Sequence, residues 1–141
     1  MYNHIFLDAN IILDIFDNTR KQHQYSATAY LTILEQGSNL YTSCDIITTL
    51  YYVYAKKNKA EALDKIQKIA QTLEIIAFSN QEVNKTCAIM KKDEDYNDLE
   101  DTIQYILAKR MACDLIISND AGFVAKDIKL VSSKAFCALM R

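Results

Sequence analysis

Short apolar runs alternate along the chain with longer segments in which apolar residues recur every three or four positions. The runs at 4–7 and 115–118 contain no alternating polar residues, which is typical of strands buried on both faces of a sheet. The longer segments carry one apolar stripe each, which indicates amphipathic helices. The pattern predicts strands at 4–7, 40–43, 74–78, 115–118 and 129–131, and helices at 9–16, 23–35, 45–56, 60–73, 80–90, 99–111 and the C-terminal end.

This alternation of strands and helices predicts an α/β fold. A parallel sheet covered on both faces accounts for it, so we expect a three-layer α/β/α architecture with a central sheet of four to five strands. The 141 residues correspond to one domain over 1–141. In open α/β sheets the functional site lies beyond the carboxyl ends of the strands. The residues that directly follow each strand are therefore the candidates for function.

The composition excludes several classes of protein. Sixteen basic against 18 acidic residues give a net charge of −2, which excludes a histone-like polycation. Proline is absent and there are only two glycines, which excludes Gly-rich phosphate loops and dinucleotide-binding motifs. No apolar stretch approaches the ~20 residues that span a bilayer. With no signal peptide and four scattered cysteines, we expect a cytoplasmic protein with reduced thiols and no membrane contact.

Acidic residues follow two predicted strands and begin one predicted helix. Asp8 follows the first strand, and Asp120 follows the fourth. Between them, residues 93–101 contain six acids in nine positions, and Asp98 and Asp101 are spaced to face the same way on a helix. Clustered carboxylates without a basic partner repel one another, and a cation stabilises them. A set of oxygen ligands favours Mg²⁺ or Mn²⁺ over zinc.

Structural roles for these acids are the alternative. Asp8 and Asp120 could be helix N-caps. The acidic run could be a solvated loop that leads into a helix, with Asn97 and Glu100 forming a capping box. A structure that placed Asp8, Asp101 or Asp120 at opposite edges of the sheet would exclude a shared site.

Several segments, in order, resemble the PIN domain family. The sequence FLDANIILD at 6–14 resembles its opening motif, a strand followed by D-x-N. The sequence DLEDTIQ at 98–104 resembles the D-x-E-D block of one bacterial branch, and IISND at 116–120, closed by Phe123, resembles a T/S-x-D-x-x-F motif. Segments 41–43 and 50–53 match a further block. The resemblance spans nearly the whole chain.

This resemblance implies an Mg²⁺- or Mn²⁺-dependent ribonuclease that hydrolyses phosphodiesters with activated water. Many single-domain bacterial members are VapC-type toxins, which a small antitoxin protein holds inactive. By the same resemblance, the metal-binding and catalytic positions are Asp8, Asp98, Asp101 and Asp120, with Asn10 and Ser118 as supporting polar positions.

One position departs from the family pattern. Thr49 stands where the family usually has Glu. Asp45 lies four residues earlier on the same predicted helix, so it shares a face with Thr49 and could act as a substitute ligand. A catalytically weakened PIN fold that serves as a binding module is therefore one alternative function. A receiver-type phosphoacceptor domain, with Asp45, Ser118 and Lys134 in its key positions, is another.

Binding partners are also implied. RNA held against an acidic site needs cations, and the candidates are Arg20, Lys21, Lys56, Lys57, Lys59, Lys65, Lys68, Lys91, Lys92, Lys109 and Arg110. Besides the RNA and an antitoxin, we expect a second copy of the chain as a partner in a dimer. The tyrosine-rich segment 51–54 is the candidate contact, and we expect Tyr51 and Tyr54 to pack in the core or at a subunit contact.

Overall fold

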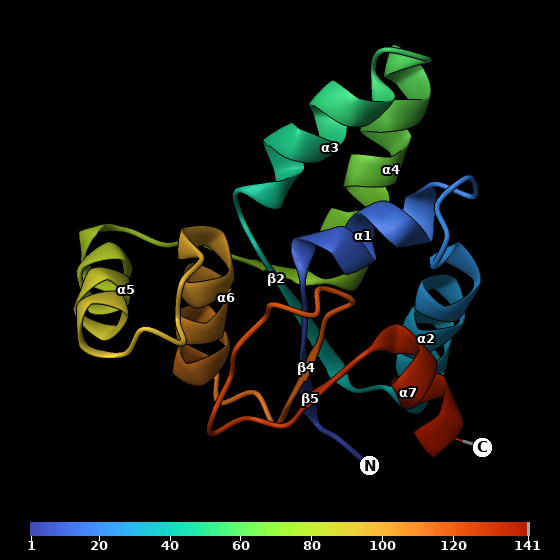
Figure 1. Cartoon of the computed structure of the whole chain (residues 1–141). Coiled ribbons are helices and arrows are strands. Elements are labelled where there is room, and N and C mark those ends of the chain that lie inside the picture. The colour runs from blue at the N-terminus through green and yellow to red at the C-terminus, as the bar shows by residue number, and fades with distance from the viewer. Residues whose placement is uncertain (141) are drawn as a thin grey trace.

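The computed structural model describes residues 1–140 and contains a five-stranded parallel sheet flanked by helices (Figure 1). The strand order is β3-β2-β1-β4-β5, and every neighbouring pair is parallel. The strands are β1 (His4–Leu7), β2 (Asn39–Ser43), β3 (Glu74–Ile76), β4 (Leu115–Ile117) and β5 (Leu130–Val131). Because β1 and β4 are hydrogen-bonded neighbours, the residues that follow them emerge side by side.

Two apolar clusters cover the two faces of the sheet. Ile5 and Leu7 belong to one cluster and Phe6 to the other, as expected where successive side chains of a strand point to opposite faces. The first cluster includes side chains of α1 (Ala9–Phe16), α2 (His23–Gln36), α3 (Ile46–Tyr54), α4 (Lys59–Thr72) and α7 (Ser133–Leu139). The second includes α5 (Asn80–Lys92) and α6 (Leu99–Arg110). The predicted three-layer α/β/α fold is confirmed.

The helix ends follow the local sequence in two informative places. Gly37 ends α2 with a left-handed φ of 76°, a conformation that glycine adopts without a steric penalty. At α6 the N-cap is Asp98, whose carboxylate accepts a hydrogen bond from the Asp101 N–H at 2.9 Å. The predicted capping box of Asn97 and Glu100 is therefore wrong, because the helix begins one residue later than that prediction requires.

The strand order also tests the receiver-type alternative. Receiver-type domains have the order 2-1-3-4-5, whereas here β1 lies between β2 and β4 in the order 3-2-1-4-5. The receiver-type alternative is therefore wrong. Within residues 1–140, no helix is both long enough and apolar enough to cross a bilayer.

Candidate active site at the carboxyl edge of the sheet

Asp8 is the first residue after β1 and is only 2% exposed. Its N–H donates to the Ile117 carbonyl at 3.0 Å, which ties the end of β1 to the end of β4. The Ser118 hydroxyl donates to Asp8 Oδ2 at 2.7 Å. Burial raises the pKa of Asp8, the Ser118 hydrogen bond opposes this, and the charge of Asp120 adds to it. Although Asp8 occupies the N-cap position of α1, its side chain makes no capping hydrogen bond.

Asp120 lies in the loop after β4, beside this buried carboxylate. Its N–H donates to Ser118 Oγ at 3.1 Å, and its Oδ1 accepts a hydrogen bond from the Gly122 N–H at 2.8 Å. A Cβ atom at position 122 would lie 3.3 Å from this Oδ1, so glycine allows the loop to close tightly on the carboxylate. No helix begins at Asp120, which excludes the N-cap interpretation.

Asp101 and Asp98 bring two more carboxylates to the same edge from the start of α6. The pKa of Asp101 is raised from 3.8 to about 8. Burial is the largest cause, followed by the charges of Asp8 and Asp98 and then by the Asp120 carboxyl. No basic group is among these causes. Four acids from three distant segments therefore influence one another at one place.

Two further acids lie beside this group. Burial raises the pKa of Glu100, and the charges of Asp45, Asp8 and Asp98 raise it further. Asp45 is the N-cap residue of α3, so the start of that helix approaches the carboxylates. Thr49 lies one turn further along α3 and is exposed. Asn10 is exposed in the first turn of α1.

Gln104 contacts this site and was not among the residues singled out from the sequence. It is 1% exposed, and its Oε1 accepts a hydrogen bond from the Ala9 N–H at 3.0 Å. Its amide also lowers the pKa of Asp8. Its Nε2 is buried and has no hydrogen-bond partner within residues 1–140. The available signal was its spacing, three residues after Asp101 on the same helix.

A second buried aspartate, Asp14, anchors the loop that carries Asp120. Its carboxylate accepts hydrogen bonds from Arg20 Nε at 2.8 Å, Ser26 Oγ at 3.0 Å and Asn119 Nδ2 at 3.0 Å. Asn119 Oδ1 accepts from the Ser133 N–H at 2.9 Å. This network links α1, α2, α7 and the loop after β4, and therefore fixes the backbone next to Asp120.

The acidic run 93–101 serves two purposes. Lys126 Nζ pairs with Asp93 Oδ2 at 2.8 Å and with Asp95 Oδ2 at 2.7 Å. The Lys126 N–H also donates to the Tyr96 hydroxyl at 3.1 Å. These contacts tie the loop before α6 to the loop after Asp120. The first acids of the run are thus paired with a cation, whereas Asp98 and Asp101 are surrounded by other acids.

The donor chemistry of the site fits a divalent cation bound by oxygen ligands. Carboxylates without basic partners are the ligands that Mg²⁺ and Mn²⁺ prefer. Within residues 1–140, no three His, Cys, Asp or Glu side chains are already closed around a common point. Because like charges favour separation, the carboxylates would have to turn inward to bind an ion.

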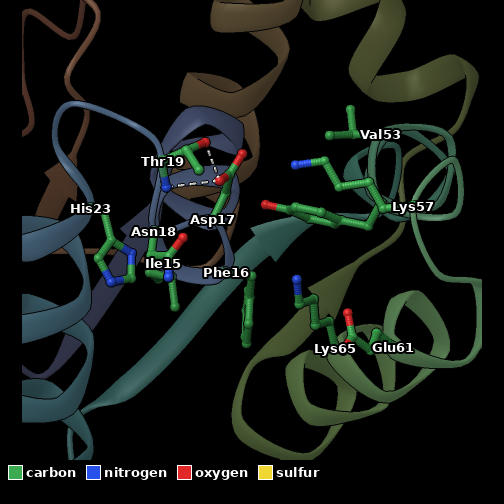
Figure 2. A pocket seen from close by; sticks show the side chains of 11 residues that line it. Ile15, Phe16, Asp17, Asn18, Thr19, His23, Val53, Lys57, Glu61 and Lys65 are labelled. Carbon is green, nitrogen blue, oxygen red and sulfur yellow. Dashed lines mark hydrogen bonds between the residues drawn. The ribbon is translucent and has the colours of Figure 1, made fainter.

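Two cavities lie near the ends of α1. One of about 390 Å³ lies along α1 and the α1–α2 loop and is lined by Asn10, Asp14, Arg20, Lys21, Gln22 and Asn119. A larger one, of about 560 Å³, lies at the far end of α1 among residues of the α1–α2 loop, α3 and α4 (Figure 2). Since α1 has eight residues, the two ends are ~12 Å apart. The larger cavity is therefore separate from the carboxylate site.

Comparisons with known proteins agree with this geometry. A family model described as PIN domain matches residues 5–129. The chain is 45% identical to "Ribonuclease VapC1" of Aquifex aeolicus over 133 residues, covering 94% of this chain and 92% of that protein.

Solved structures share the fold. VapBC-1 from nontypeable Haemophilus influenzae matches with a TM-score of 0.68 at 15% identity, covering 93% of this chain and 98% of the other. VapBC2 from Rickettsia felis, solved bound to a DNA fragment from its promoter, matches with a TM-score of 0.67 at 18% identity, covering 90% and 96%.

Proposed function

The chain belongs to the PIN domain family, and from this premise we propose that it is a VapC-like toxin ribonuclease that hydrolyses RNA phosphodiesters with Mg²⁺ or Mn²⁺. The group of carboxylates at the edge of the sheet carries this proposal. Burial and mutual repulsion raise the pKa of Asp101 to about 8, and no cation opposes them. A divalent ion bound there would remove this repulsion.

The metal ligands in this proposal are Asp8, Asp98, Asp101 and Asp120. When bound, a divalent ion lowers the pKa of the attacking water and offsets the charge that develops on the phosphate. Asp101, whose pKa burial and the neighbouring carboxylates raise in the metal-free protein, would be placed to accept the proton that the water loses.

Other side chains orient these carboxylates. Ser118 holds one oxygen of Asp8, and Gln104 binds the backbone of the next residue, Ala9. Asn119 fixes the loop that carries Asp120 through its bonds to Asp14 and Ser133. Side chains that orient metal ligands in this way commonly change metal affinity or activity when they are replaced.

We also propose a small antitoxin protein as a partner. The VapBC structures that share this fold support it. Self-association through α3 stays a prediction. Tyr54 is buried, as expected, whereas Tyr52 is 70% and Val53 is 42% exposed, which provides apolar surface for a protein contact. A cytoplasmic location likewise remains a prediction.

A weakened, non-cleaving PIN fold is the second candidate function. It is favoured by Thr49, whose hydroxyl replaces the carboxylate that the family usually has there. Because the affinity for hard cations follows the charge and number of the ligands, this replacement lowers metal affinity. In this alternative the chain binds RNA or an antitoxin and does not hydrolyse RNA.

Cleavage of a single-stranded RNA with Mg²⁺ or Mn²⁺ separates the two candidates. The wild-type chain should cleave with metal and stop when EDTA is added. Asp8→Asn should abolish cleavage, whereas Asp64→Asn, which removes the same charge from an exposed position on α4, should not. Equal cleavage by wild type and Asp8→Asn, with contaminating nucleases excluded, would contradict the proposed site. Binding without cleavage would favour the second candidate.

A further inference from the structure

The cavity of about 390 Å³ extends from sequence neighbours of two proposed metal ligands to a basic loop. Asn10, two residues after Asp8, and Asn119, directly before Asp120, form the side next to the proposed site. Arg20 and Lys21, in the loop between α1 and α2, form the opposite side. A ligand in this cavity therefore lies between two cations and the asparagines that neighbour Asp8 and Asp120 in the sequence.

Arg20 is held in one orientation by a carboxylate that is itself fully bonded. Its Nε donates to Asp14 Oδ1 at 2.8 Å, and the Asp14 side chain is only 6% exposed. Because Ser26 and Asn119 occupy the other oxygen of Asp14, this acid is shielded from a ligand in the cavity. The two Nη groups of Arg20 have no hydrogen-bond partner within residues 1–140. A planar pair of free donors matches the geometry of a phosphate.

The loop that carries Arg20 and Lys21 is fixed before any ligand arrives. Asp17 Oδ1 accepts hydrogen bonds from the Thr19 N–H at 3.0 Å and from the Thr19 hydroxyl at 2.6 Å (Figure 2). His23 Nδ1 lies 2.7 Å from the Asp14 carbonyl oxygen, so both ends of the loop are anchored. A loop that is already ordered loses little entropy on binding. Lys21 is exposed, and in the described residues its side chain has no ion pair.

Three basic residues of α6 and of the loop after β4 are already paired with acids. Lys109 binds Asp127 at 2.6 Å, and Arg110 lies 3.3 Å from Glu82. Lys126 binds two acids of the run 93–101. These pairs reduce the positive charge that the α6 side offers to RNA, whereas the α1–α2 loop keeps an unpaired lysine and free guanidinium donors at a cavity.

We propose that this cavity is a phosphate subsite, in which Arg20 and Lys21 bind the RNA backbone phosphate next to the one that is cleaved. The inference rests on the proposed ribonuclease function and specifies how that site holds its substrate. The two cations anchor the strand on one side of the carboxylates and offset their repulsion of the RNA. An acidic segment of a partner protein has related chemistry, but lining by Asn10 and Asn119, which neighbour Asp8 and Asp120 in the sequence, favours the substrate phosphate.

Steady-state cleavage of a short single-stranded RNA tests this subsite. Lys21→Ala removes an exposed side chain and should leave the fold intact, as a thermal unfolding midpoint would verify. It should raise KM about three- to tenfold and change kcat by less than about twofold, because a phosphate held equally in substrate and transition state contributes uniform binding. Arg20→Lys keeps the charge but loses the planar donor pair, and should also raise KM. Lys85→Ala, an exposed lysine on α5 that does not line the cavity, is the matched control and should match wild type.

A binding measurement gives a readout that is independent of cleavage. Fluorescence anisotropy with labelled RNA, in an Asp8→Asn background, yields the dependence of affinity on salt concentration. Each phosphate contact contributes about 0.7 to this slope for single strands, so Lys21→Ala should reduce the slope by about 0.7. A change of structure without the loss of a phosphate contact would not lower the salt dependence of the affinity by this amount.

The outcomes separate the subsite from the proposed function. If wild type cleaves RNA but Lys21→Ala and Arg20→Lys keep its KM and salt slope, the subsite is wrong and the ribonuclease proposal stands. If the chain binds RNA with the expected loss of slope but never cleaves, the subsite stands and the ribonuclease proposal fails. If Lys21→Ala leaves RNA binding unchanged and instead weakens binding of an acidic peptide, the cavity is a protein contact and the subsite is overturned.

Discussion

Asp8 and Asp14 are two buried aspartates with very different surroundings. Asp8 directly precedes α1, and Asp14 lies six residues later, within that helix. Asp14 is 4% exposed and accepts hydrogen bonds from Arg20, Ser26 and Asn119. Asp8 is 2% exposed and accepts a hydrogen bond from the Ser118 hydroxyl, while the charge of Asp120 raises its pKa and no basic side chain within residues 1–140 pairs with it. A buried carboxylate such as Asp14, whose oxygens accept several hydrogen bonds, stabilises the fold. A buried carboxylate such as Asp8, which has no basic partner in the described part of the chain and lies near other acids, is suited to bind a cation.

The largest effect is expected when an aspartate without a basic partner is replaced, compared with an aspartate that forms an ion pair. Asp101→Asn should lower RNA cleavage roughly 10²- to 10⁴-fold, because it removes both a proposed ligand and the group proposed to accept the proton. Asp127→Asn removes the same charge from an aspartate that pairs with Lys109, and should cleave as wild type. Rates measured on one RNA substrate under identical metal concentrations provide the comparison. Similar losses of cleavage in both variants would show that aspartates with and without a basic partner do not differ in function.

The next effect concerns pH. Since the pKa of Asp101 is about 8, a divalent ion competes with a proton below that pH. Calorimetric Mn²⁺ titration should show affinity that rises about tenfold per pH unit between pH 6 and 7 and levels off above about pH 8. In Asp101→Asn the dependence on pH should be much weaker. An affinity for Mn²⁺ in wild type that does not change over this range would contradict the raised pKa.

Stability should respond in opposite directions at the two kinds of aspartate. Asp14→Ala should lower the free energy of unfolding by about 2–3 kcal/mol, because it leaves Arg20 and the Asn119 amide without their buried acceptor. Asp101→Asn should raise it by about 1 kcal/mol at pH 8 in metal-free protein, because it relieves repulsion. Urea unfolding monitored by circular dichroism measures both changes.

The gain from Asp101→Asn also has a predicted pH dependence. A folded-state pKa raised above the unfolded value of 3.8 means that the contribution of Asp101 to wild-type stability is fully present below about pH 4 and is lost as pH rises through about 8. The advantage of the variant should therefore shrink as pH falls. An advantage that grows in acid would show that Asp101 is not repelled in the folded state.

The smallest effect is expected at Thr49. Thr49→Glu should tighten Mn²⁺ binding a few-fold and raise cleavage, because it adds a carboxylate to the ligand set. Asp45→Asn should weaken both if Asp45 acts as the substitute ligand, and change little if its side chain, which makes no capping hydrogen bond, stays outside the site. Calorimetric titration of both variants beside wild type makes the measurement. Unchanged or lower affinity in Thr49→Glu would mean that this position does not face the site.

The sequence predicted the architecture because its strands are continuous apolar runs separated by amphipathic helices. It also indicated Asp8 and Asp120, since residues after parallel strands share one edge, and it indicated Asp98 and Asp101 through the acidic run and the family resemblance. It did not reveal which acids are neutralised. Asp93 and Asp95 are neutralised by Lys126, which lies in a later loop, whereas Asp98 is not. The bond from Asn119 to Asp14 spans 105 positions, and no local pattern encodes such a pairing.

The sheet order sets when this site can exist during synthesis. The bond from Ser118 to Asp8 joins residues 110 positions apart, and β1 is complete long before β4 has been made. At typical translation rates the interval between them is roughly 5 to 20 seconds. Throughout that time the nascent chain has its first carboxylate but not the strand that brings the last one beside it. An interrupted or prematurely released chain that lacks β4 therefore cannot assemble the carboxylate site.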